Sequence, residues 1–191
     1  MDKLDLSASA NPHLAEMRQD GKLVYSGKFL KMQQDSVLLP DGKSTLREYI
    51  KHPGAVVILP VFDDGTVLME RQYRYPLDQV FIEFPAGKID QGEEALATAK
   101  RELLEETGYT ATDWRYLCTI HNAIAYSDEH LDIFLARGLT AGQAELDDGE
   151  FLETFKAPVA DLLEWVKSGK ITDVKTVIGS FWLEKILDGK W

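Results

Sequence analysis

The most constraining feature of this 191-residue sequence is the stretch Gly87–Tyr109, whose pattern indicates a loop, a helix and a stop. Asp90 and Glu93 stand three residues apart, which is the spacing of a capping box at a helix N-terminus. Apolar residues then recur at helical spacing, at Ala95, Leu96, Ala99 and Leu103. Gly108 follows where many helices end on a residue with a left-handed backbone conformation. We therefore expect an amphipathic helix that is capped by Asp90 and ends at Gly108.

The second half of this helix carries an acidic face. Glu102, Glu105 and Glu106 are three or four residues apart, so their side chains lie near one another. Two like charges about 4 Å apart repel by roughly 4 kcal/mol at an effective dielectric constant near 20. A hard divalent cation would reverse the sign of that energy, and Arg101 can also bridge to Glu105. A solvated acidic face is the plainer alternative, and the helix alone leaves it open.

These residues belong to a longer pattern, GX5EX7REUXEEXGU with U apolar, which the sequence matches from Gly87 to Tyr109. On this pattern the chain resembles the Nudix hydrolases. The resemblance implies an α+β fold, an α/β/α sandwich with a mixed central sheet, which hydrolyses a nucleoside diphosphate linked to another group. It also implies that magnesium, with manganese as a substitute, is held by Glu102, Glu105, Glu106 and the backbone carbonyl of Ala86.

An N-terminal extension precedes the region of this motif. Three strand-like runs predict a small antiparallel sheet: Lys22–Leu30, Lys31–Leu39 and Ser44–Lys51. Residues 1–20 predict only a short helix or a frayed end. The break at His52-Pro53-Gly54 indicates a boundary, so we expect residues 1–52 to form the β extension and residues 53–191 the catalytic domain.

Hydrophobic patterning predicts the remaining elements of the catalytic domain. Strands are expected at Gly54–Val61, Thr66–Arg71, Val80–Phe84, Trp114–His121, Leu131–Ala136 and Glu150–Lys156. Pro158, at a first helical position, is expected to start a helix over Val159–Ser168. Asp173 is expected to cap a last helix, Val174–Leu187.

Two arginines and a glutamate are candidate substrate contacts. An arginine fork can bind phosphate oxygens through two hydrogen bonds, and Arg71 and Arg74 both occur in the run RQYRYP. The Q-Y-R context resembles the ADP-ribose pyrophosphatase branch of the family, which favours Arg74 over Arg71. Glu83, in E-F-P-A-G, matches the same branch, where this residue lies near the substrate. Surface arginines, and a glutamate that merely precedes a buried turn, are the structural alternatives.

The extension also resembles that branch, in the stretch from Arg47 to Val56. The resemblance implies a homodimer whose N-terminal sheets exchange across a two-fold axis, so that Tyr25, Phe29 and Arg47 would help to build the partner's nucleoside pocket. A role in the core or on the sheet face is the alternative for each of them.

A loop after the motif extends the resemblance and also departs from it. Ser127-Asp128-Glu129 matches a loop of the branch and makes Glu129 a further candidate contact. Ile124 stands where many ADP-ribose pyrophosphatases have proline, which leaves room for other nucleoside diphosphate sugars.

Hydrolysis also requires a group that accepts a proton from the attacking water. The resemblance implies that it comes from the acidic loop after the motif. Glu150 is the first choice, Glu153 the second and Asp148 the third, and Glu105 on the helix is a further catalytic candidate. A solvated acidic loop remains the alternative.

Composition limits the partners and the compartment. The net charge is −11, with 32 acidic and 21 basic residues and no basic patch, which disfavours nucleic acid. The single cysteine, Cys118, cannot form an intrachain disulfide and is expected to be a buried strand residue in a reducing compartment. The sequence shows no signal-peptide pattern and no membrane-length apolar run, so we expect a cytoplasmic protein.

Together, these features predict a pyrophosphatase of nucleoside diphosphate sugars, with ADP-ribose as the leading substrate and a nucleoside monophosphate and a sugar phosphate as products. A housecleaning hydrolase of modified nucleotides or dinucleoside polyphosphates is the first alternative; the N-terminal sheet and the Q-Y-R run argue against it. A non-catalytic Nudix-fold nucleotide sensor is the second, although none of the glutamates of the motif is missing.

Overall fold

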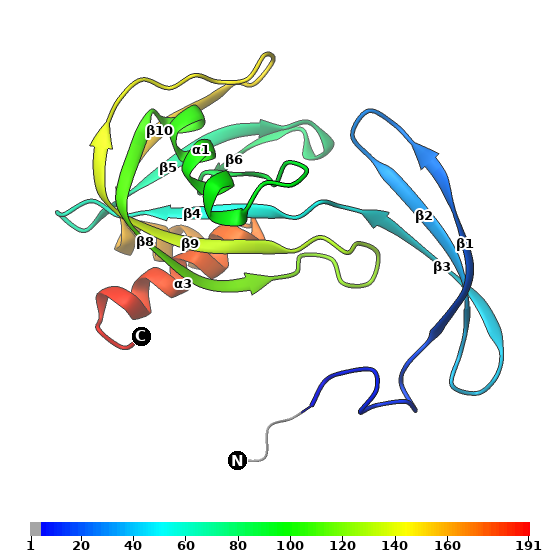
Figure 1. Cartoon of the computed structure of the whole chain (residues 1–191). Coiled ribbons are helices and arrows are strands. Elements are labelled where there is room, and N and C mark those ends of the chain that lie inside the picture. The colour runs from blue at the N-terminus through cyan, green and yellow to red at the C-terminus, as the bar shows by residue number, and fades with distance from the viewer. Residues whose placement is uncertain (1–4) are drawn as a thin grey trace. The chain divides into compact units, whose positions relative to one another are not determined.

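The computed structural model describes residues 5–191 and divides into two compact units (Figure 1). The first comprises residues 5–52 together with Ala123–Glu129, and the second comprises Pro53–Asn122 together with His130–Trp191. Within residues 5–20 the chain makes turns and then enters the first strand, so no helix forms there. The rest of the segment expected to be helical or frayed, residues 1–4, lies outside the described residues.

The first unit is a three-stranded antiparallel sheet with the order β1 (Met17–Ser26), β2 (Lys31–Leu38) and β3 (Ser44–Lys51). The third strand has the expected bounds, and β2 ends one residue before the expected Leu39. The first strand runs from Met17 to Ser26 rather than from Lys22 to Leu30. The loop Ala123–Glu129 joins this unit because the N–H of Ile50 donates to the carbonyl of Tyr126 at 2.9 Å and Lys51 pairs with Asp128.

The second unit contains two sheets. A mixed sheet has the order β7 (Ala86–Lys88), β4 (Ala55–Pro60), β9 (Leu131–Ala141) and β8 (Tyr109–Ile120), with β4 parallel to β9. An antiparallel sheet has the order β10 (Leu152–Pro158), β5 (Thr66–Arg74) and β6 (Gln79–Glu83). The helices are α1 (Ala95–Thr107), α2 (Val159–Lys167) and α3 (Val174–Leu187), and a short 3-10 helix, η1, spans Tyr75–Leu77.

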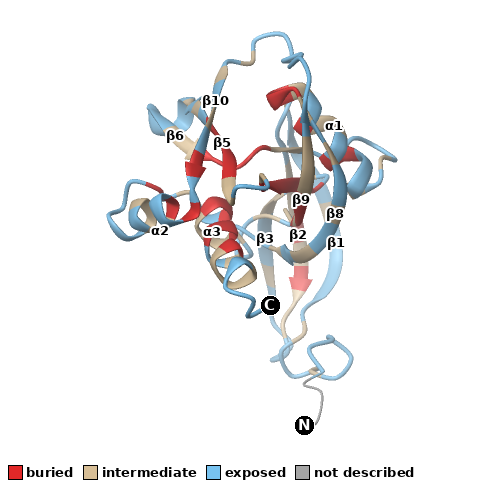
Figure 2. Ribbon diagram, turned by 90° about the vertical axis from the view of Figure 1, so that its left-hand side faces the viewer, coloured by how far each residue is buried: buried red, intermediate tan, exposed pale blue. Residues whose placement is uncertain are grey.

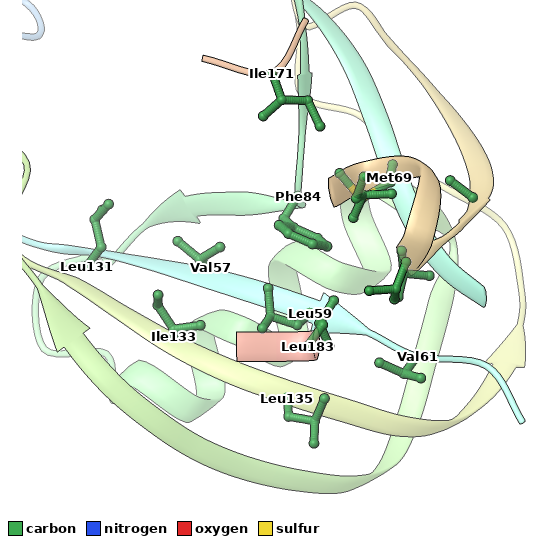
Figure 3. Packing of buried hydrophobic residues seen from close by; sticks show 14 of the residues in the cluster. Val57, Leu59, Val61, Met69, Phe84, Leu131, Ile133, Leu135, Ile171 and Leu183 are labelled. Carbon is green, nitrogen blue, oxygen red and sulfur yellow. The ribbon is translucent and has the colours of Figure 1, made fainter. Parts of the chain in front are cut away.

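Helices cover both faces of the mixed sheet, and β4 is buried along its whole length. Because side chains alternate along a strand, Val56 and Ile58 pack with Leu103 of α1, whereas Val57 and Leu59 pack in the opposite cluster. Figure 3 shows that second cluster, which includes Leu183 of α3. In Figure 2 the buried residues gather on the sheets and on the helix faces turned toward them. The predicted α/β/α sandwich is therefore confirmed.

The ends of α1 test the local signals in the sequence. Its C-terminal end is confirmed: Gly108 has a φ of 72° and its N–H donates to the carbonyl of Leu104 at 2.8 Å. The predicted capping box at Asp90 is wrong, because the residues after Asp90 form a turn and the helix begins only at Ala95. The Glu93 carboxylate instead accepts hydrogen bonds from side chains of the helix, at Thr98 and Arg101.

Other boundaries follow the sequence to different degrees. Helix α3 has the predicted bounds, and the Asp173 carboxylate accepts a hydrogen bond from the N–H of Thr176 at 3.0 Å, as a cap should. Pro158 is the N-cap of α2 rather than its first helical residue. The strands β8 and β9 are longer than expected because their ladder continues to the pair Tyr109 and Ala141.

Candidate functional site

The acidic face of α1 lies against the backbone of β7. The N–H of Ala86 donates to Oε2 of Glu106 at 3.1 Å, and Glu106 is only 4% exposed. A Cβ added at Gly87 would lie 1.9 Å from Cδ of Glu102, so only glycine lets that carboxylate approach the strand so closely. Gly87 and Glu102 of the motif thus pack directly against each other, and Glu106 binds the neighbouring residue Ala86.

Arg101 compensates part of the negative charge on this face. Its Nη1 donates to Glu102 and to Glu105, both at 2.8 Å, and its Nη2 donates to Glu93 at 3.0 Å. The expected bridge from Arg101 to Glu105 is therefore confirmed. Within residues 5–191 no three His, Cys, Asp or Glu side chains converge as a ready metal site; Arg101 holds two of the candidate carboxylates instead.

Glu70 and Glu106, two buried glutamates of the second unit, have raised pKa values. Glu70, on β5, is 0% exposed, and neither of its carboxylate oxygens accepts a hydrogen bond from the described part of the chain. Burial, and then the charge of Glu83, raises the pKa of Glu70 from 4.5 to about 8. Burial also raises the pKa of Glu106 well above its ordinary value, and the charges of Glu70, Glu102 and Glu150 raise it further. The negative charges of these carboxylates, called the carboxylate cluster below, therefore act on one another.

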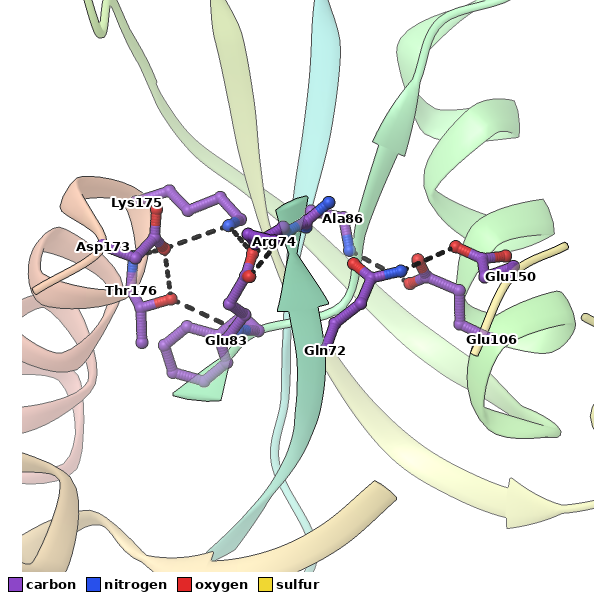
Figure 4. Close-up of polar contacts among 10 residues, drawn as sticks. Gln72, Arg74, Glu83, Ala86, Glu106, Glu150, Asp173, Lys175 and Thr176 are labelled. Atoms are coloured by element: carbon purple, nitrogen blue, oxygen red, sulfur yellow. Dashed lines mark hydrogen bonds and ion pairs between the residues drawn. The ribbon is translucent and has the colours of Figure 1, made fainter. Parts of the chain in front are cut away.

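The acidic loop contributes Glu150 to this cluster. Nε2 of Gln72 donates to Oε1 of Glu150 at 3.2 Å (Figure 4), which ties the loop to β5. The pKa of Glu102 is raised by burial, against the effect of Arg101, and the Glu150 charge adds to this increase. The charge of the first-choice base thus acts on two carboxylates of the motif, Glu102 and Glu106.

The two candidate arginines lie on opposite faces of β5, because residues three apart on a strand point to opposite sides. Arg74 shares its face with Gln72 and Glu70. Arg71 instead donates to Glu153 of β10 at 2.6 Å, on the face that also carries Phe155. Arg71 and Glu153 border a hollow of about 470 Å³ on that face, so the second-choice base lies apart from Glu150 and the cluster.

Arg74 is held by a network that the sequence did not predict. Its Nε and Nη2 donate to the two oxygens of Glu83 at 2.7 and 2.8 Å, and Lys175 contacts the same carboxylate (Figure 4). Lys175 also donates to Asp173 at 3.0 Å. Burial by itself raises the pKa of Glu83, but Arg74 and Lys175 outweigh it, so the pKa is lowered. The sequence predicted Asp173 as a helix cap, but no local signal linked Lys175 to Glu83.

The remaining candidates lie in the first unit or outside the cluster. Tyr25 and Phe29 are exposed on or next to β1, and Arg47 of β3 pairs with Glu16 through two hydrogen bonds. Glu129 lies in the loop that joins this unit, with a carboxylate oxygen 3.6 Å from Nε2 of His52. Asp148 is exposed in the acidic loop. Cys118 is a strand residue, as predicted, but only half-buried, and burial raises the pKa of its thiol.

Comparison with known proteins identifies the family. The family model of the NUDIX domain matches residues 51–175. The chain therefore belongs to the Nudix hydrolases, in the branch that contains the ADP-ribose pyrophosphatases.

Relatives along most of the chain support this assignment. The chain is 40% identical over 163 residues to the ADP-ribose pyrophosphatase of Bacillus subtilis (strain 168), covering 84% of this chain and 88% of that protein. It is 36% identical to the methanol dehydrogenase activator of Bacillus methanolicus, with the same coverage of 84% and 88%. A crystal structure of an ADP compounds hydrolase superposes with a TM-score of 0.83 at 23% identity, covering 93% of this chain and 97% of that one.

The structure bears on the membrane prediction in one respect. Within residues 5–191, no helix combines the length and the apolar character needed to cross a bilayer. The cytoplasmic location stays a prediction.

Proposed function

We propose that this Nudix hydrolase is a metal-dependent pyrophosphatase of nucleoside diphosphate sugars, with ADP-ribose as its leading substrate. Relatives named ADP-ribose pyrophosphatase, and an ADP-sugar pyrophosphatase of Mus musculus that is 30% identical, support this substrate class. The observation that carries the proposal is the acidic face of α1, where buried Glu106 and partly buried Glu102 lie against β7. Partly buried Glu150 is tied to β5, the strand that presents Arg74.

The carboxylate and carbonyl oxygens of this cluster are suitable ligands for a hard divalent cation. Burial, and then the negative charges of neighbouring carboxylates, raise the pKa of Glu106, and a cation would neutralise those charges. Carboxylate and carbonyl oxygens are the ligands that Mg²⁺ prefers. We propose that Mg²⁺, or Mn²⁺ in its place, is held by Glu102, Glu105, Glu106 and the Ala86 carbonyl, once Arg101 releases its bonds to two of these carboxylates. When bound, such an ion neutralises diphosphate charge and acidifies nearby water.

Glu150 is the proposed general base. Water attacks one phosphorus, the bond from that phosphorus to the bridging oxygen breaks, and Glu150 accepts the proton that the water loses. Its hydrogen bond from Gln72 positions the carboxylate at the cluster. Glu105 is paired with Arg101 and Glu153 with Arg71, so both are less available as bases.

Arg74 is the proposed phosphate contact. Two of its N–H groups are taken by Glu83, and an arginine has five, so it keeps donors for phosphate oxygens. Glu83 and Lys175 fix the direction of the guanidinium. Arg71, on the other face of β5, has no such access to the cluster.

The first unit is the proposed dimerisation element. In a homodimer, Tyr25, Phe29 and Arg47 would contact the nucleoside bound to the partner subunit, and Glu129 would contact it from the adjoining loop. The exposure of Tyr25 and Phe29 supports this proposal. A monomeric mass in light scattering at micromolar concentration would argue against it.

A product assay with ADP-ribose, ADP-glucose and GDP-mannose tests the proposed function. We expect a nucleoside monophosphate and a sugar phosphate, and loss of turnover after exhaustive chelation. Glu106→Gln should lower turnover about 100-fold or more, whereas Glu164→Gln on the exposed side of α2 should leave it unchanged. Pyrophosphate release from nucleoside triphosphates, with the sugar substrates intact, would reject the substrate class and favour the housecleaning alternative. Unchanged turnover of Glu106→Gln would show that the cluster is not catalytic.

A further inference from the structure

Glu70 is the one buried carboxylate of the cluster that has no part in the reaction described above. It lies in the middle of β5, where Val67 and Met69 point into the hydrophobic core. By strand alternation Glu70 points to the other face, together with Gln72, whose side chain holds Glu150. The sequence pattern did not single it out, because one carboxylate in a mostly apolar strand carries no spacing signal.

The environment of Glu70 differs from that of any paired acid in the chain. The charges that act on it come from Glu83, Lys175, Arg74 and Glu150, and its own charge acts on Glu106. Both cationic side chains in that set hydrogen-bond to Glu83, and no group in residues 5–191 donates a hydrogen bond to either oxygen of Glu70. An unpaired buried carboxyl group is costly, whereas leucine or methionine would fit a buried strand position without that cost. Its presence therefore points to a partner that residues 5–191 do not supply.

A divalent cation is the partner that fits this position. It would satisfy oxygen atoms that lack donors, and it would neutralise the mutual repulsion of Glu70 and Glu106. We propose that Glu70 and Glu106 together bind the divalent cation of the active site, so that the ion is held from β5 as well as from α1. This inference rests on the cation site of the proposed function and adds a ligand from outside the sequence motif.

Binding of Mn²⁺ to the full-length protein, measured by titration calorimetry, tests the inference without using activity. The variants are Glu70→Gln and Glu70→Met, with Glu106→Gln as the positive control and Glu164→Gln as the matched surface control. We expect both Glu70 variants to weaken Mn²⁺ binding about 10-fold or more, as Glu106→Gln does, while Glu164→Gln binds like the wild type.

Thermal unfolding supplies a second readout. Without a divalent cation, both Glu70 variants should unfold at a midpoint equal to or higher than that of the wild type, because an unpaired acid has been removed. Added Mn²⁺ should raise the wild-type midpoint and leave theirs nearly unchanged. A structural role alone would lower the midpoint in the absence of the ion.

The outcomes separate this inference from the proposed function. Wild-type affinity in the Glu70 variants together with a loss in Glu106→Gln would overturn the role of Glu70 and leave the proposed function intact. Failure of the wild type itself to bind Mn²⁺ would reject both. Loss of the fold in both Glu70 variants would also overturn the inference, because Glu70 would then be needed without the cation.

Discussion

Glu70 and Glu83 face each other across the ladder of β5 and β6, yet their environments are opposite. Both are buried, at 0% and 2% exposure. Glu83 binds Arg74 and Lys175 and its pKa is lowered, whereas Glu70 has no hydrogen-bond donor among residues 5–191 and its pKa is raised to about 8. Burial alone therefore does not determine whether the pKa of a buried glutamate is raised or lowered here; the charged partners of the side chain determine it.

The difference separates a structural ion pair from a candidate binding site. The network around Glu83 joins β6 to the start of α3, because Lys175 and the capping residue Asp173 belong to that helix. Glu70, by contrast, receives no hydrogen bond from residues 5–191. After burial, its charge is the next cause of the raised pKa of Glu106. Buried groups with strongly shifted pKa values are typical of functional sites.

The sharpest test is to make Glu83 resemble Glu70. Lys175→Met removes one buried cation, and we expect the free energy of unfolding to fall by about 3 kcal/mol, because a buried carboxylate loses part of its compensation. Urea denaturation measures this change. Lys167→Met, which removes an exposed partner of Glu164, is the control and should change stability by less than about 0.5 kcal/mol. Equal effects of the two substitutions on the free energy of unfolding would show that the buried pairing of Glu83 does not distinguish it from an exposed ion pair.

The pH dependence of stability gives the next largest effect. The folded state holds the proton of Glu70 more tightly than the unfolded chain does. The contribution of Glu70 to the free energy of unfolding is therefore complete below pH 4.5 and is lost as the pH rises toward about 8. Without divalent cations, the free energy of unfolding of the wild type should fall with pH in this window more steeply than that of Glu70→Gln, by up to about 1.4 kcal/mol per pH unit. Glu83, whose pKa is lowered, behaves in the opposite way and loses its contribution in acid. Denaturant titrations across the window that give parallel curves would contradict the prediction.

The smallest expected effect concerns the end of the network in α3. Asp173→Ala removes the side chain that accepts from the N–H of Thr176 and from Lys175, and should lower the free energy of unfolding by about 1 kcal/mol. Asp173→Asn keeps a capping oxygen and should recover most of that loss in the same urea assay. If the two variants are equally destabilised, the charge toward Lys175 matters more than the cap.

Local signals in the sequence determined several elements correctly. The end of α1 at Gly108 and the whole of α3, with its cap at Asp173, follow from residues within one or two helical turns. The acidic face of α1 and its bridge from Arg101 to Glu105 follow from the same spacing. The capping box at Asp90 failed because the same spacing also occurs in a turn, and the chain turns there before the helix begins.

Tertiary structure alone decided the partners of the buried charges. Lys175 reaches Glu83 across 92 residues, and Glu150 meets Gln72 across 78, so no local pattern encodes either contact. The placement of Arg71 and Glu153 on one face, and of Arg74 on the other, depends on the pairing of β5 with both neighbouring strands. Spacing along the chain determines what a helix or strand presents on each side, but only strand register and packing determine which charge then lies opposite it.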